Sequence, residues 1–378
     1  MSVGSTTTPS RGVLVHEWIE QHGGSEKVLD AMASTFPGID MVCLWSNAPD
    51  RYVGHTVRQT WLAHTPIRRS KALAMPAMPL VWRHLPGGDY DWALVSSHAF
   101  AVQARFREQP VHHRKFVYTH TPARYVWTPE LDERGSSRGV RAVAPFFRAI
   151  DRRRAKEAHA IAANSAYVRQ RIARTWEREA TIIHPPVDVE CIQQVDCWAD
   201  RLSDADRSQL DGLPDQFVLG VSRFIPYKRL DLVIRAGEAA DVPVVLAGAG
   251  PDEALLRAQA ERCSVPVHFI RQPSDELLYS LYERACLFVF PAVEDFGIVP
   301  VEAMASGTPV LSGDTGGVIE SVVDDKTGVH VHDWNDTNLG DLVQRAADLD
   351  AEVCRIHARA FDVARFQDEI RCWIDRSL

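Results

Sequence analysis

The sequence predicts an α/β protein built from two doubly wound domains, each with a parallel sheet, that face each other across a cleft. The chain has 378 residues, whereas one domain usually holds roughly 100 to 200. Short apolar runs bounded by turn residues alternate with segments of helical periodicity, which is typical of βαβ units. This pattern restarts after "HPPVDVE" (184–190), so we expect two domains of the same kind.

The first half of the chain holds five expected strands. Each is a short, mainly apolar run of the kind typical of a buried strand, and the alternation with helical segments predicts a parallel sheet. Helical spacing separates them, for example in "GSEKVLDAMASTF" and "RRRAKEAHA". The expected strands are "GVLVH" at 12–16, "MVCLW" at 41–45, "WALVSS" at 92–97, "KFVYTH" at 115–120 and "AIAANS" at 160–165.

The second half repeats this Rossmann-like layout. In open α/β sheets, ligands bind beyond the carboxyl ends of the strands, so the loops after these runs are where chemistry is expected. The expected strands are "FVLGVS" at 217–222, "PVVLAG" at 243–248, "VHFI" at 267–270, "CLFVF" at 286–290 and "TPVLS" at 308–312.

Four segments follow from this pattern. Residues 1–11 are polar and form a disordered tail. Residues 12–184 and 185–358 form the two domains, joined at the prolines of 185–186, which suppress helix. Residues 359–378 form a C-terminal helix that we expect to pack back toward the N-terminal domain.

Charge differs between the halves. Of the net charge of −8, residues 1–185 carry +9 and residues 186–378 carry −17. A basic half can approach phosphates or an anionic membrane surface. Two solvated surfaces of unequal charge are the alternative.

The seven cysteines form no C-x-x-C pair, which favours reduced, mostly buried thiols in a cytoplasmic protein. No run of about 18 uncharged apolar residues occurs, and residues 1–12 lack the apolar core of a signal peptide. We therefore expect a chain that neither spans a membrane nor is exported by that route.

Two glutamates follow the apolar run "CLFVF". Glu294 and Glu302 stand eight positions apart in "PAVEDFGIVPVEAMASGTPVLSGDTGG" (291–317). Since "GIVPVEAMASG" predicts a helix, its first N–H groups and its dipole favour a phosphate at that end. Carboxylates accept hydrogen bonds in pairs and suit sugar hydroxyls. The alternative is that both glutamates simply face solvent.

A second cluster lies in "VSRFIPYKRLDLVI" (221–234). Arg223 follows a strand directly, and Lys228 comes five residues later. Two fixed cations beyond a strand end suit a diphosphate. A basic cluster on the surface without a ligand would have the same sequence.

These motifs in this order resemble a known family, the retaining nucleotide-sugar glycosyltransferases of family 4, which have the GT-B fold. The resemblance rests on "SRFIPYKRLDLVI", "LAGAGP", the E-x7-E motif of Glu294 and Glu302, and "SGDTGGVIE". In the first half it is carried by "HEWIEQHGGSEKVL", "YTHTPARYVW" and "ANSAYVRQRI". It covers most of the chain.

The resemblance implies a role for each matching residue. Glu302 would bind the ribose hydroxyls and Glu294 the hydroxyls of the donor sugar, while Arg223 and Lys228 would neutralise the departing diphosphate. Together with His120, the last three are the expected catalytic residues. The expected nucleotide-sugar-binding residues are Gly24, Ser222, Arg271, Phe296, Gly297, Ile298, Val299 and Glu302.

In the first half, the resemblance assigns the "GGSE" turn to the diphosphate and the acceptor, with Gly23, Ser25 and Glu26 as acceptor residues. His120, at the end of "KFVYTH", resembles the family histidine that reaches the donor sugar. The family usually has a glycine turn where this chain has "FIRQP", so Arg271 either contacts the base or faces solvent.

The resemblance further implies that no metal and no other cofactor are needed. "GDYD" (88–91) contains a D-x-D but precedes a strand, and no H-x-x-H motif or cysteine cluster indicates a zinc site. A covalent intermediate would need a carboxylate on the opposite face of the sugar, and no residue is nominated for it. We therefore expect a front-face reaction in which the leaving phosphate helps to deprotonate the acceptor.

The bacterial branch that transfers mannose from GDP-mannose during surface polysaccharide assembly is the most similar one. The expected function is transfer of mannose to a glycan or lipid-linked acceptor. A UDP-sugar transferase, a nucleotide-sugar 2-epimerase and a non-catalytic nucleotide-sugar binder are the alternatives.

Residues 61–85 mix apolar side chains with Arg68, Arg69 and Lys71, which suits peripheral contact with the cytoplasmic face of a membrane. A core segment with a solvated basic edge is the alternative. Two methionine-proline breaks argue against one long amphipathic helix there.

Overall fold

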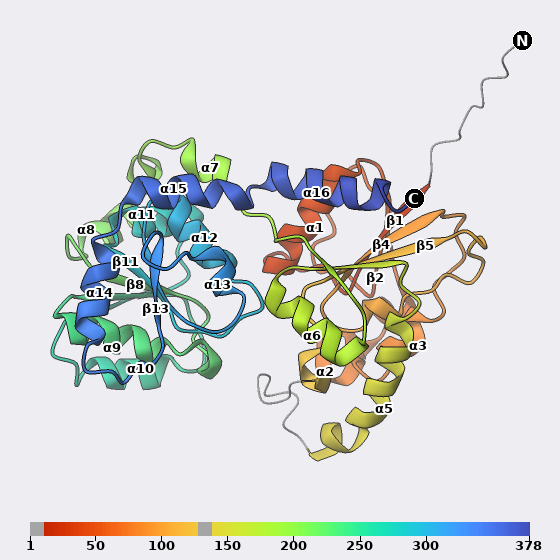
Figure 1. Ribbon diagram of the computed structural model, residues 1–378, viewed down its shortest axis with the longest axis horizontal. Coiled ribbons are helices and arrows are strands. Elements are labelled where there is room, and N and C mark those ends of the chain that lie inside the picture. The colour runs from red at the N-terminus through yellow and green to blue at the C-terminus, as the bar shows by residue number, and fades with distance from the viewer. Residues whose placement is uncertain (1–10, 128–137) are drawn as a thin grey trace, which may run out of the picture. The chain divides into compact units, whose positions relative to one another are not determined.

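The computed structural model describes residues 11–127 and 138–378, which form two compact units (Figure 1). Unit 1 comprises residues 1–185 together with 366–378, and unit 2 comprises residues 186–365. Except for Arg11, the predicted tail lies outside the described residues.

Unit 1 is built on a seven-stranded parallel sheet with the strand order β3-β2-β1-β4-β5-β6-β7, and helices cover both of its faces (Figure 1). Its strands are β1 Gly12–His16, β2 Asp40–Cys43, β3 Val57–Gln59, β4 Trp92–Ser97, β5 Arg114–Thr119, β6 Ala160–Ala163 and β7 Thr181–Ile182. Its helices are α1 Gly24–Thr35, η1 Trp61–His64, η2 Pro66–Arg69, α2 Lys71–Ala74, α3 Met78–Trp82, η3 Ala101–Gln103, α4 Arg124–Trp127, α5 Arg138–Ala155, α6 Ala166–Trp176 and, from Phe366 on, α16 Val363–Asp375.

Unit 2 has a six-stranded parallel sheet with the order β10-β9-β8-β11-β12-β13. Its strands are β8 Val218–Val221, β9 Val244–Ala247, β10 Val267–Ile270, β11 Leu287–Phe290, β12 Val310–Gly313 and β13 Gly328–Val331. Its helices are α7 Val189–Gln193, η6 Trp198–Arg201, α8 Asp204–Asp211, η7 Pro226–Lys228, α9 Leu230–Ala240, α10 Glu253–Ala260, α11 Asp275–Arg284, α12 Ile298–Ala305, α13 Val318–Ser321, α14 Leu339–Ala347, α15 Ala351–Ala358 and η8 Arg359–Phe361.

The two predicted parallel sheets are therefore confirmed, and the alternation of side chains explains their composition. In β11, Leu287 and Val289 enter one hydrophobic core, whereas Phe288 and Phe290 enter the other, on the opposite face. Successive strand residues point to opposite faces, so a strand covered on both faces must be apolar at every position.

Residues 61–85 fold as four short helical segments, η1, η2, α2 and α3. This confirms that no single long helix forms there. Ser70 separates η2 from α2, and its side chain accepts a hydrogen bond from the backbone N–H of Leu73 (3.4 Å). Among the residues that the structure describes, no helix combines the length and the hydropathy that crossing a membrane requires.

The prediction of one helix over 359–378 was wrong at its start, because α16 begins at Val363. Asp362 has extended backbone angles (φ −63°, ψ 152°). Its carboxylate accepts hydrogen bonds from the backbone N–H groups of Ala364 (2.9 Å) and Glu190 (3.0 Å). Asp362 thus stops the preceding η8 turn and caps α16.

In unit 1, the part of α16 from Phe366 on packs against β5, an interior strand of the sheet. The ring of Phe366 lies edge-on to Tyr118, and that of Trp373 lies edge-on to Phe116, with centroid distances of 5.6 and 5.3 Å. All four side chains are buried or nearly so. Residues 366–378 therefore complete the core of unit 1.

The prediction of mostly buried thiols was wrong. All seven cysteines lie among the described residues and are free, but only Cys43 and Cys354 are buried, while Cys191, Cys197 and Cys372 are exposed. The helices that carry Cys191 and Cys372 cover the cores with their other faces, through Ile192 and Trp373 for example.

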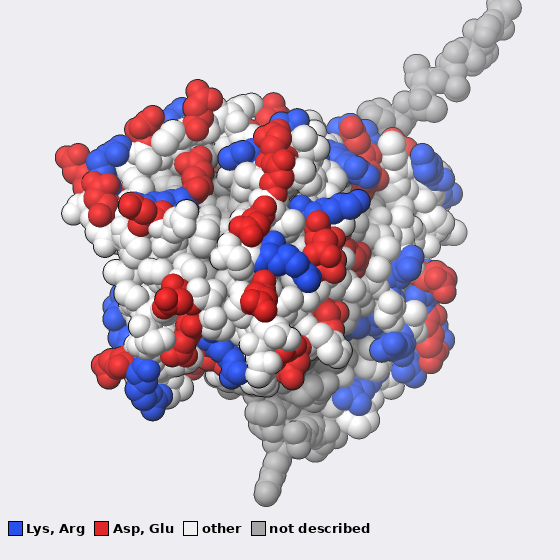
Figure 2. Space-filling view, turned by 60° about the vertical axis from the view of Figure 1, so that its left-hand side comes forward, with Lys and Arg blue, Asp and Glu red and all other residues white. Residues whose placement is uncertain are grey.

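The charge difference between the halves does not gather into one patch on the described part of the face shown in Figure 2. There, Lys and Arg side chains lie among Asp and Glu side chains. Mixed charge of this kind is ordinary for a solvated surface.

A buried carboxylate, Glu17, connects β1 to the turn after β4. It accepts hydrogen bonds from the backbone N–H groups of Ala99 (2.8 Å) and Ala101 (2.6 Å). Burial raises its pKa to about 7, although these bonds act in the opposite direction. At mildly acidic pH the folded protein therefore holds a proton on Glu17.

We expect Glu17→Gln to lessen the loss of stability between pH 5 and pH 8. The ordinary pKa of Glu17 is 4.5 and the folded pKa is about 7, so the folded state binds more protons in this window and loses that advantage as the pH rises. The variant, whose amide still accepts both N–H groups, should remove a pH-dependent term of at most roughly 3 kcal/mol. Urea denaturation at both pH values, with the exposed Glu108→Gln as control, measures it; equal pH dependence in wild type and Glu17→Gln would contradict a protonated Glu17.

Candidate active site

The site in unit 2 begins where the order of its strands reverses. β8 and β11 are parallel neighbours there, although four helices (η7, α9, α10 and α11) and two strands separate them in the chain. Arg223 and Lys228 follow β8, and Glu294 follows β11. In a doubly wound sheet, this reversal opens a crevice at the carboxyl ends of the strands, where ligands bind.

Lys228 and Glu294 form an ion pair at this point. Their side chains are only 13% and 22% exposed, so the attraction is screened less than at the open surface. The ammonium of Lys228 also lies 5.3 Å from the centroid of the Tyr227 ring, and Arg223 Nη2 donates a hydrogen bond to Tyr227 Oη (3.3 Å). The structure thus brings together three of the four residues that the sequence assigned to catalysis.

Two glycines of the "GDTGG" run hold the Glu294 loop in place. Gly316 has a φ of +104°, and a Cβ there would lie 2.8 Å from Glu294 O. A Cβ on Gly317 would lie 2.2 Å from Asp295 O, and the Gly317 N–H donates to Glu294 O (2.8 Å). Only glycine permits this approach of two backbones.

The turn after β9 supports the β8 end in the same way. A Cβ on Gly248 would lie 1.9 Å from Ser222 O, and one on Gly250 would lie 2.3 Å from Phe224 O. "GAGP" therefore packs against "SRF", which fixes the backbone on both sides of Arg223.

Helix α12 begins next to the Glu294 loop. Gly297 precedes it with a φ of +96°, and no side chain of the described residues caps this end. The first N–H groups of a helix have no partner within it, so those of Ile298 and Val299 are suited to an anion. Phe296 is buried and packs against Phe361 (5.5 Å between ring centroids), which anchors the turn.

Glu302 has a different environment from Glu294. It lies in the second turn of α12 and is 4% exposed. It stands near Tyr279 and Tyr282 of α11; burial is the main cause that raises the pKa of both phenols, and the Glu302 charge adds to it.

Two other predicted residues flank this cluster. Ser222 lies directly after β8 and is half-buried. Arg271 follows β10, two strands from β8 in the sheet order, and is 68% exposed. Its Nε lies 3.5 Å from Glu253 Oε2, so Arg271 makes a surface ion pair.

In unit 1, the "GGSE" turn leads into α1, with Gly23 and Gly24 exposed. Glu26, however, is buried, and its carboxylate accepts hydrogen bonds from Ser25 Oγ (2.8 Å) and the Glu20 N–H (3.2 Å). A Cβ on Gly23 would lie 2.1 Å from Glu26 Oε2, and burial raises the pKa of Glu26. The geometry shows a carboxylate that fixes the turn.

His120 follows β5 in unit 1 and belongs to a row of side chains at the strand ends. Its Nε2 shares a hydrogen bond with Ser96 Oγ (2.8 Å), and Ser96 Oγ shares another with His16 Nδ1 (3.0 Å). His16 is buried, and burial followed by the His120 charge lowers its pKa to about 3. A neutral His16 and the Ser96 hydroxyl therefore orient the His120 ring.

Sequence reasoning missed His16 and Ser96 as partners of His120. Each ends or nearly ends a predicted strand, at 12–16 and 92–97, so adjacency of these strands was the signal that could have found them. Among residues 11–127 and 138–378, no group of three or more His, Cys, Asp or Glu side chains is arranged to hold a metal ion.

We expect Gly317→Ala to destabilise unit 2 by about 1–3 kcal/mol, because the added methyl group overlaps Asp295 O. The φ of Gly317 is −73°, which any residue adopts, so the clash is the whole effect. Gly212→Ala is the matched control: its φ is −78°, and its nearest neighbour would be 3.5 Å away. Urea denaturation compares the two, and equal midpoints would show that the Glu294 loop does not depend on this contact.

Comparison with known proteins agrees with this geometry. Residues 204–360 match the family model described as "Glycosyl transferases group 1". The chain is 32% identical over 223 residues to the "GDP-mannose-dependent alpha-(1-6)-phosphatidylinositol monomannoside mannosyltransferase" of Mycolicibacterium smegmatis, which covers 53% of this chain and 57% of that protein. It is 32% identical over 215 residues to the "D-inositol 3-phosphate glycosyltransferase" of the same organism, 52% and 47% of the two chains. The matches thus span about half the length of these relatives.

Solved structures match over nearly the whole chain. Anabaena Alr3699/HepE in complex with UDP superposes with a TM-score of 0.69 at 17% identity, over 97% of this chain and 100% of that one. Sucrose-phosphate synthase from Thermosynechococcus elongatus gives 0.68 at 17% identity, over 97% and 98%. The chain therefore has the GT-B fold, and the resemblance to GT-B glycosyltransferases expected from its motifs is confirmed.

Proposed function

We propose that this chain is a retaining glycosyltransferase that transfers a hexose, mannose from GDP-mannose, to a glycan or lipid-linked acceptor. The observation that carries the proposal is the Lys228–Glu294 ion pair where the strand order of unit 2 reverses, beside the start of α12. It joins a cation that suits a phosphate to a carboxylate that suits sugar hydroxyls.

In this proposal the nucleotide sugar binds to unit 2. Its diphosphate accepts hydrogen bonds from the first N–H groups of α12 and is neutralised by Arg223 and Lys228. Glu294 exchanges Lys228 for sugar hydroxyls, and Glu302, whose burial favours strong hydrogen bonds, binds the ribose. The match of residues 204–360 to the group 1 model supports this assignment.

The reaction breaks the bond between the sugar C1 and the diphosphate oxygen, so charge develops on the leaving phosphate. Fixed cations and N–H groups aimed at that charge are usually the largest source of rate enhancement. The acceptor hydroxyl attacks from the same face as the departing phosphate, which takes its proton, so the sugar configuration is retained. For His120, whose ring Ser96 orients, we propose the role toward the donor sugar that the family histidine has.

The choice of mannose and GDP rests on similarity to the mycobacterial mannosyltransferase, which its name describes as GDP-mannose-dependent. Few contacts decide donor identity, and fold does not imply substrate. UDP-glucose, UDP-galactose and UDP-N-acetylglucosamine are therefore the donors to test beside GDP-mannose.

We expect GDP-mannose to raise the melting temperature of the wild-type protein and the three UDP-sugars not to do so. A ligand that binds only the folded state stabilises it by mass action, by about 2.7 kcal/mol at one hundred times its Kd. Glu302→Gln, which keeps the size of the side chain, should lose most of this shift. Glu276→Gln, on the exposed side of α11, should keep it.

The outcome of this thermal-shift screen distinguishes between the candidate donors and tests whether a nucleotide-sugar site exists at all. A shift with a UDP-sugar alone would replace the donor while leaving the glycosyltransferase proposal in place. No shift with any of the four would contradict the nucleotide-sugar site. If a separate turnover assay without acceptor showed conversion of the donor into its 2-epimer, the epimerase alternative would be favoured.

We expect Lys228→Met to lower kcat by about 100-fold or more, because the leaving phosphate loses a preorganised cation. It should also reduce the free energy of unfolding by roughly 1–3 kcal/mol, because Glu294 is left largely buried without its partner. The double variant Lys228→Met/Glu294→Gln should recover stability without activity. If the double variant regained activity, the charge of Lys228 would have only a structural role.

A further inference from the structure

The ends of β1, β4 and β5 bring three polar side chains into one row. His16 is paired with Ser96 in the parallel register of β1 and β4, and Ser96 is paired with Tyr118 of β5. His120 comes two residues after Tyr118, on the same side of the strand. Ser96 Oγ lies 3.0 Å from His16 Nδ1 and 2.8 Å from His120 Nε2. One hydroxyl group therefore joins two imidazole rings.

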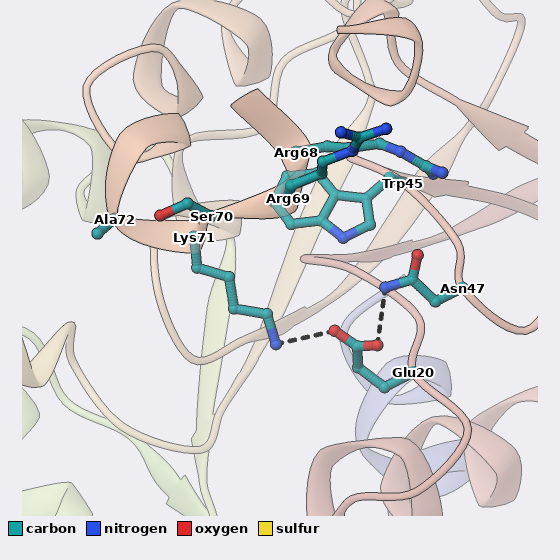
Figure 3. A pocket seen from close by; sticks show the side chains of 8 residues that line it. All are labelled: Glu20, Trp45, Asn47, Arg68, Arg69, Ser70, Lys71 and Ala72. Atoms are coloured by element: carbon teal, nitrogen blue, oxygen red, sulfur yellow. Dashed lines mark hydrogen bonds and ion pairs between the residues drawn. The ribbon is translucent and has the colours of Figure 1, made fainter. Parts of the chain in front are cut away.

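The rings around this row are aromatic and exclude solvent from its inner end. The His98 ring lies 5.6 Å from that of His16, and the Trp18 ring stands edge-on to His98 at 4.7 Å. Trp18 in turn stacks on Trp45, which lines the pocket shown in Figure 3. His16 and Ser96 are each only 1% exposed, so their polar atoms depend on partners inside the protein.

The Ser96 hydroxyl has one proton and two nitrogens beside it. Among the described residues, Ser96 Oγ has no hydrogen-bond partner besides His16 Nδ1 and His120 Nε2. If both rings donated to the oxygen, the buried hydroxyl proton would have no acceptor. Ser96 therefore accepts from one ring and donates to the other, which leaves two possible arrangements of the protons.

His16 decides between the two arrangements. Burial, followed by the His120 charge, lowers the pKa of His16 to about 3, so the ring is neutral and carries one N–H group. Its Nε2 is buried without a hydrogen-bond partner in residues 11–127 and 138–378. An N–H group at this atom would give up its hydrogen bond to water without a replacement, and buried donors of this kind are rarer than unpaired acceptors. The proton therefore belongs on Nδ1.

The backbone of Ser96 favours the same assignment. Whereas burial lowers the pKa of His16, a hydrogen bond with this backbone acts to raise it. A backbone group that favours a proton on the ring is a carbonyl, which only accepts hydrogen bonds. Since the ring meets Ser96 through Nδ1, the N–H group of His16 lies at this nitrogen.

We propose that His16 is a positioning residue that fixes, through Ser96, the proton of the neutral His120 ring on Nδ1. His16 Nδ1–H donates to Ser96 Oγ, and the Ser96 hydroxyl donates to His120 Nε2, which must then be without a proton. The role of His120 toward the donor sugar rests on the proposed function. The position of its proton rests on the contacts of His16 and Ser96 alone.

The position of this proton determines which sugar atoms His120 can recognise. With the proton on Nε2, Nδ1 could bind the sugar only by accepting a proton from a hydroxyl group. With the proton on Nδ1, the ring can donate to any sugar oxygen, including the ring oxygen and the glycosidic oxygen, which carry no proton. Ser96 and His16 thus make His120 a hydrogen-bond donor at Nδ1.

The experiment is ¹⁵N NMR of the full chain, labelled in the histidine rings, at neutral pH and without substrate. Couplings between ring protons and nitrogens distinguish the nitrogen that carries a proton from the one that does not, and His120→Gln identifies the His120 signals. Wild type should show His16 and His120 each with the proton on Nδ1. In Ser96→Ala, His120 should change to the Nε2–H form that free histidine prefers.

Two variants of His16 separate proton position from packing. The side-chain amide of His16→Asn can place an N–H group near the position of Nδ1–H, so this variant should keep His120 in the Nδ1–H form. His16→Leu removes the donor and should give the same change as Ser96→Ala. The control is Ser321→Ala, because the buried Ser321 hydroxyl donates to Val318 O in unit 2 (3.2 Å); it should leave His120 unchanged.

An Nε2–H form of His120 in wild type overturns the inference. An Nδ1–H form that persists in both Ser96→Ala and His16→Leu also overturns it, since the row would then not determine the proton position. In a turnover assay, Ser96→Ala should lower kcat by roughly tenfold or more, because a wrong histidine tautomer is costly in catalysis, and His16→Asn should retain most of the wild-type rate. A changed tautomer with unchanged kcat would overturn the role of this proton toward the sugar.

The donor screen separates this result from the proposed function. A GDP-mannose shift beside an Nε2–H form of His120 overturns the inference alone. An absence of any nucleotide-sugar shift contradicts the proposed function, whereas the NMR measurement, made without substrate, still decides where the proton lies.

Discussion

The Lys228–Glu294 ion pair joins the ends of β8 and β11, two strands that are distant in the chain and adjacent in the sheet. Their adjacency depends on the reversal of strand order in unit 2, and the reversal depends on apolar strands that are covered on both faces. The glycines of "GAGP" and "GDTGG" then carry the two loops close enough for the charges to meet. Sheet topology and backbone contact therefore position the charged groups, and no long-range electrostatic attraction is needed to assemble them.

Much of this fold could be predicted from the sequence, because buried parallel strands leave a strong signal. The runs 92–97 and 267–270, for example, coincide with observed strands. β3, β7 and β13 were not predicted. β3 and β7 have only three and two residues, respectively, and a run that short has no measurable periodicity. Register and pairing between distant strands, which decide that Ser96 meets both His16 and His120, have no local signal at all.

In the candidate site, too, some residues could be predicted from the sequence, whereas the surroundings of others could not. Arg223, Lys228 and Glu294 were predicted as a group from their positions after strands and from the family motifs, and the structure brings them together. Glu26 was assigned from a family motif, whereas Arg271 stands where the family usually has a glycine and was expected either to contact the base or to face solvent. The structure places Arg271 in a surface ion pair and Glu26 inside its own turn. A motif fixes which residue types occur and in what order, whereas exposure and the choice of partner are properties of the packed chain.

In the sequence, unit 2 lies between the two segments of unit 1, residues 1–185 and 366–378. Trp373 and Phe366 cover Phe116 and Tyr118 of β5, so these two contacts are missing until residues 366–378 have been made. Unit 2 is complete earlier, at Arg365. Unit 1 therefore cannot complete its core until residues 366–378 are free of the ribosome, and until then β5 lacks the aromatic partners that α16 supplies.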